Sequence, residues 1–243
     1  SADGGDTWTR TLTNLTYDIL HHPTDPLRAV AGQHDGPPLY STDGGATWQA
    51  ATGFTAHRVE IRYARSNPSV VYAAASDANR IRIYRSTNGG MSYALQTSGT
   101  GISTYAAYNN VLWVDPNDES RMILGGVTYN RSTDAGVTFA GVFGSVHSDM
   151  HAIVEASGYN GTTNRTVYFG NDGGIYRASD INGNSATGLN IDLGITQFYG
   201  AAVNPAGVIL GGTQDHGSLR SETTVNNWPH PFGGDGGYCA ADP

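Results

Sequence analysis

An eight-residue motif recurs along the chain, and its clearest copy is Ser41-Thr42-Asp43-Gly44-Gly45-Ala46-Thr47-Trp48. Three more copies begin at Ser1, Ser86 and Ser132, and two weaker ones lie near Ser179-Asp180 and Ser221. Successive copies start 40 to 47 residues apart. Repetition at this period indicates a chain built from repeated structural units.

The shared pattern, Ser-x-Asp/Asn-x-Gly-x-Thr/Ser-aromatic, predicts a tight turn. A short Asp or Asn side chain accepts hydrogen bonds from nearby backbone amides, and glycine supplies the positive φ that such turns need. The aromatic residue begins the next strand and packs against its neighbours. We therefore expect structural roles for Ser1, Asp3, Trp8, Ser41, Asp43, Trp48, Ser86, Asn88, Tyr93, Ser132, Asp134 and Phe139.

Each period also contains four short strand patterns. Alternating stretches such as 59–63 are followed by a proline turn and an apolar run such as 70–73. Four strands in 40 to 50 residues predict one blade of an all-β propeller. The predicted blades are 13–52, 53–98, 99–143, 144–190 and 191–230, with the end of a blade at 1–12 and the start of another at 231–243.

Composition excludes several classes of protein. The net charge is −8, and the 13 basic residues are all arginines scattered along the chain, which argues against a nucleic-acid partner. No apolar run approaches ~18 residues, so we expect no membrane insertion. A single cysteine excludes an internal disulfide framework and a Cys-rich zinc site.

The eight-residue motif resembles the Asp box, or bacterial neuraminidase repeat, of sialidases, sortilin-type receptors and xyloglucanase-type glycoside hydrolases. The second half of the chain is similar to large secreted bacterial propellers of the sortilin-like and xyloglucanase-like type. That similarity rests on the segments 147–152, 170–177, 195–199, 211–217 and 233–238. The resemblance implies a secreted or cell-surface protein.

The register of the repeats predicts part of a larger ring. The chain opens inside an Asp box and closes on what reads as a first strand, and propellers of this resemblance usually have seven blades or more. We expect either a piece of a seven-bladed ring or a sixth blade closed by the two ends. Unpaired terminal strands favour self-association or pairing with the rest of the propeller.

Two kinds of metal site are suggested by the residue pattern. His147, Asp149 and His151 alternate, so on a strand they would share one face and could hold a transition metal. The alternative is a hydrogen-bonded polar lining of the channel. Asp-rich turns such as 115–118 offer the oxygen ligands that calcium prefers, although Asp boxes normally satisfy their own hydrogen bonds.

Three aspartates are candidates for glycoside hydrolysis, which needs a pair of carboxylates. Asp172, Asp215 and Asp235 precede glycine turns at what we take to be matching points of successive blades, where they would lie around one mouth. Asp172 resembles the catalytic context of xyloglucanases, but that class places its partner acid on a second propeller. Asp-Gly is also a common tight turn. Beside them, we expect Tyr176, Gln197, Tyr199 and Gln214 to contact a ligand.

A sialidase site is the weaker resemblance. It would use arginines together with Tyr63 and Glu60, and candidate cations are Arg58, Arg62, Arg65, Arg82 and Arg85. Because residues 58, 60 and 62 alternate on one strand, they more simply predict an ion-paired sheet face. The Arg-Ile-Pro motif of sialidases is absent.

The sequence therefore predicts a propeller module that binds glycan or protein, or builds an assembly, without catalysis and without a required cofactor. The alternative is a xyloglucanase-like glycoside hydrolase that uses paired aspartates.

Overall fold

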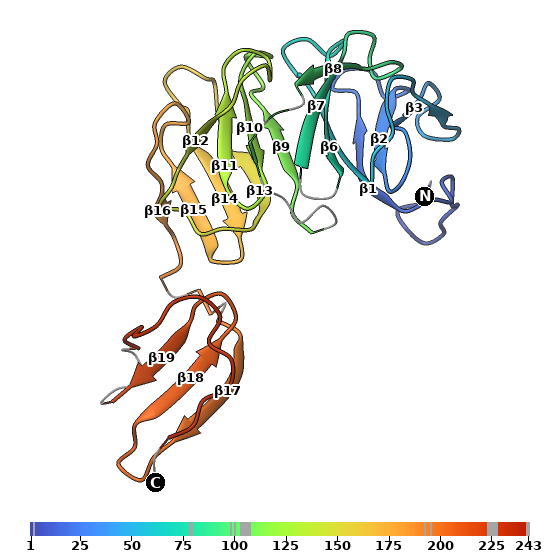
Figure 1. The fold of residues 1–243 in the computed structure, drawn as a ribbon. Coiled ribbons are helices and arrows are strands. Elements are labelled where there is room, and N and C mark those ends of the chain that lie inside the picture. Colours follow the sequence, from blue (N-terminus) through green and yellow to red (C-terminus); the bar gives the residue numbers. More distant parts are fainter. Residues whose placement is uncertain are drawn as a thin grey trace. The chain divides into compact units, whose positions relative to one another are not determined.

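The computed structural model describes residues 1–243 except 2, 78–79, 98, 100, 103–107, 192, 195, 223–227 and 242–243. None of the described residues lies in a helix. They form four four-stranded antiparallel sheets and a fifth sheet of three strands (Figure 1). No helix in this part of the chain is long and apolar enough to cross a bilayer.

Each sheet is a meander whose strands pair in chain order. The first contains β1 (Thr16–His21), β2 (Ala29–Gln33), β3 (Leu39–Ser41) and β4 (Gln49–Ala50). The second contains β5 (Arg58–Tyr63), β6 (Val71–Asp77), β7 (Arg80–Ser86) and β8 (Ala94–Thr97). The third contains β9 (Val111–Val114), β10 (Met122–Gly125), β11 (Tyr129–Ser132) and β12 (Ala140–Val142).

The fourth sheet contains β13 (Met150–Glu155), β14 (Val167–Asn171), β15 (Gly174–Ala178) and β16 (Thr187–Gly188). The fifth contains β17 (Phe198–Val203), β18 (Ile209–Thr213) and β19 (Ser218–Ser221). Repeated short antiparallel meanders are the architecture of propeller blades, so the predicted all-β class is confirmed.

The Asp boxes that begin at Ser41, Ser86 and Ser132 form the turns between the third and fourth strands of their sheets. In the box at Ser41, the Asp43 carboxylate accepts a 2.8 Å hydrogen bond from the Thr47 amide, and the Ser41 hydroxyl accepts one of 2.8 Å from the Gly45 amide. The copies at Ser1, Ser86 and Ser132 form the same bonds. The boxes therefore satisfy their own polar groups.

The aromatic residues that end the boxes differ in burial. Tyr93 is buried, Trp48 and Phe139 are half-buried, and Trp8 is 79% exposed. The Trp8 indole N–H donates to the Gly5 carbonyl at 2.9 Å, so it packs on its own turn. It is not the core anchor that the repeat predicts, because residues 1–12 lie outside the strands that pair in this structure.

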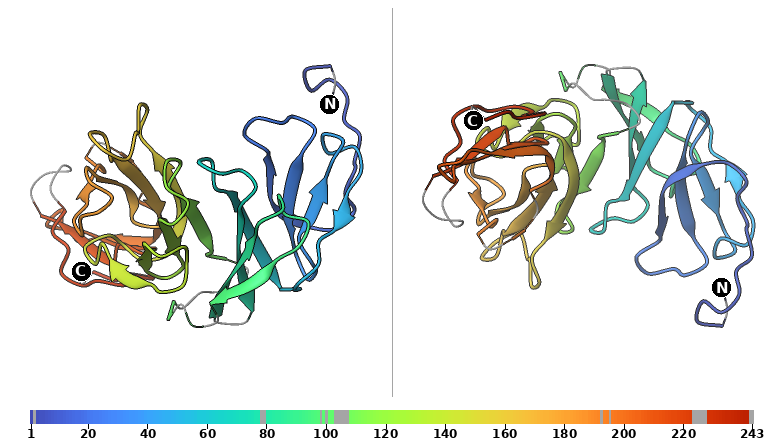
Figure 2. Two further views of the ribbon diagram at one scale, coloured as in Figure 1. Left: turned by 90° about the horizontal axis from the view of Figure 1, so that it is seen from above. Right: turned by 90° about the horizontal axis from the view of Figure 1, so that it is seen from below.

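The four sheets of residues 1–171 and 176–187 pack face to face in sequence order (Figure 2). Strand β6 shows how, because its side chains alternate between two cores. Val71, Ala73 and Ala75 pack with the first sheet, whereas Tyr72 and Ala74 pack with the third. A third core joins β9–β12 to β13–β16. Alternating burial on both faces explains the continuous apolar run of β6.

A second compact unit comprises Asp172–Ile175 and Gly188–Pro243. It holds the fifth sheet and a segment that runs beside it, where Phe232 bridges to Ser218 and Asp235 to Gly217. Large apolar side chains of this unit are exposed, among them Val203 at 66% and Tyr238 at 92%.

The first strands of the first four sheets lie side by side, β1 beside β5, β5 beside β9 and β9 beside β13. Three first strands share an irregularity near their start, where the pairing skips Tyr17, His151 and Tyr199. A bulge turns the skipped side chain away from regular alternation. The sheets therefore repeat not only the Asp box but also an irregular pairing at the start of β1, β13 and β17.

Candidate functional site

A cavity of about 520 Å³ lies along the first strands of the first four sheets. Its size is in the range of ligand pockets. Strands β1, β5, β9 and β13 all contribute to its wall, which is formed by Leu20, His21, Pro23, Arg62, Tyr63, Arg65, Trp113, Val114, Ile153, Val154 and Glu155. We call this feature the inner-strand cavity.

Strand β5 carries a set of ion pairs, and one of its arginines, Arg62, lines the inner-strand cavity. Glu60 is 7% exposed and accepts a 2.7 Å hydrogen bond from the Arg58 guanidinium. Arg62 pairs with Asp18 of β1, whose carboxylate also accepts a bond of 3.1 Å from the Ile61 amide. The predicted ion-paired sheet face is confirmed, because both arginines of β5 form ion pairs with acidic side chains.

Burial controls the protonation of Glu60. Loss of solvent, reinforced by the nearby Asp18 carboxylate, raises the pKa of Glu60 to about 7 despite the two neighbouring arginines. The carboxyl group therefore titrates near neutral pH in the folded protein.

A second ion pair crosses the inner-strand cavity. Arg65 contacts Glu155 of β13, and the Trp113 indole N–H donates to the other Glu155 oxygen at 2.9 Å. The Arg65 side chain is 51% exposed and that of Glu155 is 21% exposed. This pair faces solvent more openly than the pairs on β5.

The apolar wall is aliphatic where it is accessible. Val154 is 58% exposed, whereas Trp113 and Tyr63 are only 4% and 6% exposed. The Trp113 and Tyr63 rings are thus packed into the cores on either side rather than presented to a ligand.

The structure does not bring His147, Asp149 and His151 together. His147 and Asp149 precede β13, and Asp149 has a φ of 62°, which breaks the expected alternation on one strand. Asp149 accepts a 2.7 Å bond from the Asn109 amide group, and the His151 ring packs edge-on against Tyr108. A positive-φ turn and a bulge thus interrupt the strand on which one shared face was expected.

Two of the three candidate aspartates are neighbours. The Asp235 carboxylate accepts a 3.0 Å hydrogen bond from the Asp215 amide, so its oxygen stabilises a turn at which Asp215 has a φ of 59°. Asp172 lies in the hairpin between β14 and β15, whose Gly173 carbonyl accepts a 2.7 Å bond from Asn190.

The expected ligand contacts fall into two groups. The Gln197 carbonyl accepts a 2.9 Å bond from the Gln214 amide, and Tyr199 is 44% exposed at the bulge of β17. Tyr176 lies on β15 and packs against the core between the third and fourth sheets. It is therefore partly a packing residue.

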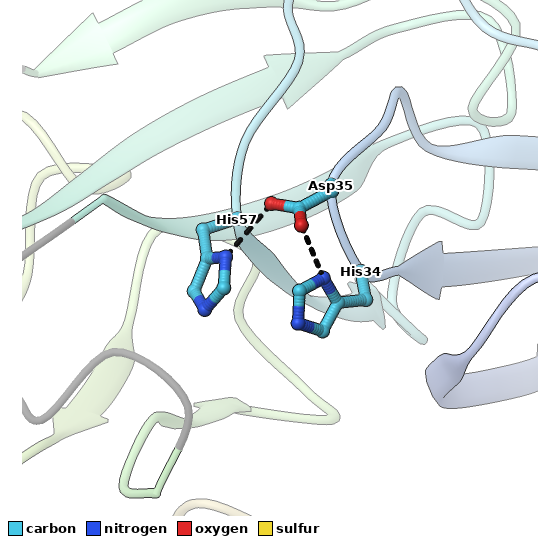
Figure 3. Close-up of side chains that lie close together, drawn as sticks. All are labelled: His34, Asp35 and His57. Atoms are coloured by element: carbon cyan, nitrogen blue, oxygen red, sulfur yellow. Dashed lines mark hydrogen bonds and ion pairs between the residues drawn. The ribbon is translucent and has the colours of Figure 1, made fainter.

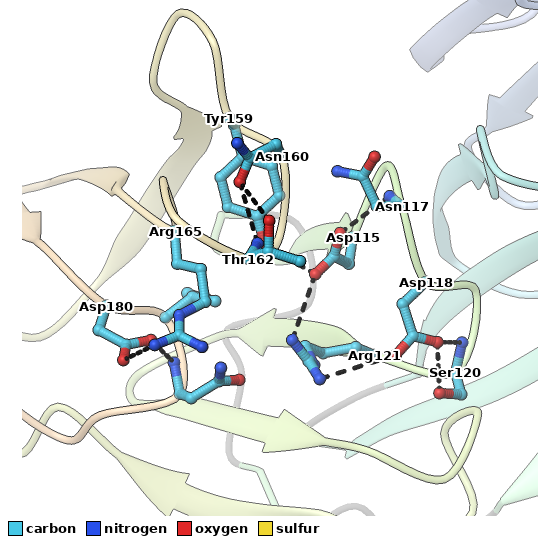
Figure 4. Close-up of polar contacts among 12 residues, drawn as sticks. Asp115, Asn117, Asp118, Ser120, Arg121, Tyr159, Asn160, Thr162, Arg165 and Asp180 are labelled. Atoms are coloured by element: carbon cyan, nitrogen blue, oxygen red, sulfur yellow. Dashed lines mark hydrogen bonds and ion pairs between the residues drawn. The ribbon is translucent and has the colours of Figure 1, made fainter.

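The Asp-rich turn at 115–118 uses its carboxylates internally (Figure 4). Asp115 accepts bonds from the Asn117 amide at 2.9 Å and the Tyr159 hydroxyl at 2.7 Å. Ser120 donates twice to Asp118, which lowers the pKa of that carboxyl. Arg121 lies within 4 Å of both acids. The carboxylates that the sequence offered to calcium therefore have protein partners in this turn.

A different cluster was not singled out by the sequence pattern. His34, Asp35 and His57 come from neighbouring sheets, and Asp35 lies between the two imidazoles (Figure 3). Among the described residues, this is the set of three whose ligand atoms all lie within 4.8 Å of one another. The one parallel in the sequence is that Gln33-His34-Asp35-Gly36 runs from the last residue of β2 into the next turn, whereas Gln214-Asp215-His216-Gly217 directly follows β18.

Comparison with known proteins shows similarity of fold. No protein-family model and no curated protein sequence matches the chain. The glycoside hydrolase family 74 (GH74) xyloglucanase from Xanthomonas campestris matches 92% of this chain and 39% of its own length, at 19% identity and a TM-score of 0.62. An ancestral GH74 enzyme matches 95% of this chain and 33% of its own, at 17% identity and a TM-score of 0.56.

A YCF48 structure bound to a D1 peptide also matches, over 89% of this chain and 66% of that one, at 10% identity and a TM-score of 0.53. The chain thus spans about a third to two-fifths of the GH74 structures and two-thirds of YCF48. At these identities the comparisons show that the chain has the fold of β-propeller blades.

Proposed function

We propose that this chain is a non-catalytic, secreted or cell-surface binding module that holds a peptide segment of a partner protein in the inner-strand cavity. The proposal rests on one observation. Four successive first strands form a single cavity whose wall contains both paired charges and accessible aliphatic side chains. Sites built on packed strands hold their groups rigidly.

The wall chemistry favours peptide over glycan. Sugar rings stack on accessible aromatic faces, but Trp113 and Tyr63 are more than nine-tenths buried. Val154, Ile153 and Leu20 instead offer branched aliphatic surface, which suits an apolar side chain. The similarity in fold to YCF48, itself seen with a peptide, is consistent with this choice.

Arg65 supplies the polar anchor. Its ion pair with Glu155 is half-exposed, so holding that pair contributes little stability. A ligand carboxylate can displace Glu155 and form a bidentate contact with the guanidinium. Glu155 then keeps the hydrogen bond from the Trp113 indole. We therefore expect a ligand with an acidic group next to an aliphatic residue.

Selection from a random peptide display library tests the proposal, followed by fluorescence anisotropy of the enriched peptides. We expect enriched peptides to pair an acid with an aliphatic residue, and Arg65→Gln or Val154→Asp to weaken their binding tenfold or more. Arg165→Gln is the matched control, because Arg165 pairs with Asp180 at 2.8 Å and does not line the cavity. Glycan-array binding that is lost in Arg65→Gln would favour a glycan ligand instead.

Glycoside hydrolysis is the second candidate, favoured by the adjacency of Asp215 and Asp235 in a fold shared with GH74 enzymes. It predicts release of reducing sugar from xyloglucan or another β-glucan, abolished by Asp172→Asn or Asp215→Asn. Intact protein that releases no sugar across a polysaccharide panel rejects it.

A further inference from the structure

We propose that His34, Asp35 and His57 form a binding site for a divalent transition metal, with zinc as the representative ion. The site is separate from the inner-strand cavity, since none of the three residues lines it. It also lies apart from the His147 segment in which the sequence pattern suggested a metal.

Backbone contacts hold the three residues in place before any ion binds. His34 and Asp35 follow β2, and His57 precedes β5. The Asp35 amide donates to the His57 carbonyl at 3.0 Å, and residues 36 and 56 form an antiparallel bridge. The His57 amide is in turn held by the Asp77 carboxylate at 3.1 Å. The two loops therefore form one paired unit across two sheets.

The three side chains already lie together, with the Asp35 carboxylate held between the two imidazoles. Asp35 lies 2.7 Å from His57 Nδ1 and 2.9 Å from His34 Nδ1, one carboxylate oxygen to each ring, with the ring centroids 4.2 Å apart (Figure 3). The ligand atoms of a tetrahedral zinc site are roughly 3.3 Å apart. Since the present separations are at most 4.8 Å, closure on an ion needs only small side-chain movements.

The chemistry of the set selects the type of ion. A neutral imidazole carries its proton on either nitrogen, so each ring can present a lone pair to a metal. Two imidazoles and one carboxylate suit zinc, copper or nickel, whereas calcium prefers oxygen ligands alone. Tyr17 stacks on His34 at 5.7 Å and restrains that ring.

The site leaves an open coordination position. It borders a hollow of about 440 Å³ lined by Asp35, His57 and Asp77 among others, and Asp35 is 68% exposed. Three protein ligands with access to solvent allow water or a donor group of a partner to complete the coordination. A bound ion would also join the turn after β2 to the start of β5.

Isothermal titration calorimetry with zinc on the full chain, first stripped with a chelator, tests the site. We expect one ion per chain in the wild type, with a melting temperature raised by zinc. His34→Ala, His57→Ala and Asp35→Asn should each weaken binding at least tenfold, because each removes one ligand. Calcium should not compete.

His147→Ala is the matched control, since it removes a histidine outside the cluster. It should leave zinc affinity unchanged. Circular dichroism and melting of each variant without metal separate loss of the site from loss of the fold, and Asp35→Asn keeps the side-chain shape. Absence of zinc binding by the wild type, or equal loss of affinity in His147→Ala, would overturn the proposal.

Discussion

The aspartates of the Asp boxes act as charged acceptors for their own turns. Asp43 accepts bonds from the Thr47 amide and hydroxyl and from Ser41, and these bonds lower its pKa to about 2. Asp134 has the same partners at matching positions and the same shift. Asn88 uses its amide group in this role, which shows that the turn geometry does not itself require charge.

Replacing Asp43 with Asn should therefore reduce the acid sensitivity of the protein. A carboxyl whose pKa is lower in the folded state contributes stability above its unfolded value of 3.8, and this is lost as pH falls through about 2. Urea unfolding of wild type and Asp43→Asn should be measured between pH 2 and 6. As the pH falls, the unfolding free energy should decrease less in the variant than in the wild type. Equal losses would contradict the role assigned to the carboxylate.

Glu60 should have the opposite pH dependence. Its pKa is raised to about 7, so its contribution to stability is fully present below the unfolded value of 4.5 and is lost as pH rises through 7. We predict that the unfolding free energy of the wild type falls between pH 5 and 7.5 and that Glu60→Gln flattens this fall. If the unfolding free energy of Glu60→Gln fell with pH as steeply as that of the wild type, a group other than Glu60 would be responsible for the fall.

At the scale of the elements, the close approach of β2 to β5 depends on one glycine. A Cβ added at Gly32 would lie 2.0 Å from the Val59 carbonyl oxygen, which is part of the backbone and cannot rotate away. Gly32→Ala should lower the unfolding free energy by about 2 kcal/mol or more, since overpacking forces the strands apart. Gly144→Ala, where nothing lies within 4 Å, is the control for equilibrium denaturation. Similar losses in both variants would contradict this packing.

The sequence predicted the elements better than the sites because the two depend on different information. The box period and the apolar runs are local, so the four-stranded sheets could be predicted from them. The alternation expected for His147, Asp149 and His151 assumes a regular strand, and the φ of 62° at Asp149 violates that assumption. The His34–Asp35–His57 cluster joins residues of two sheets, and no local pattern shows that the turn after β2 meets the start of β5.

At the scale of the whole molecule, the buried apolar side chains are unevenly distributed. Among the described residues, those in the core lie between Ala29 and Ile181, and the fifth sheet has none of them. Hydrogen exchange measured by mass spectrometry should show slow exchange in β6 and β10 and fast exchange in β17, because sheets with few buried contacts open more readily. Protection of β17 equal to that of β6 would indicate that other surfaces cover the fifth sheet.

The binding role of the inner-strand cavity is the central claim, and peptide affinity with and without its polar anchor tests it most directly. Fluorescence anisotropy of an enriched acidic–aliphatic peptide should show saturable binding to the wild type and to Arg165→Gln. The same peptide should bind Arg65→Gln at least tenfold more weakly. Equal affinity for all three proteins would contradict the claim.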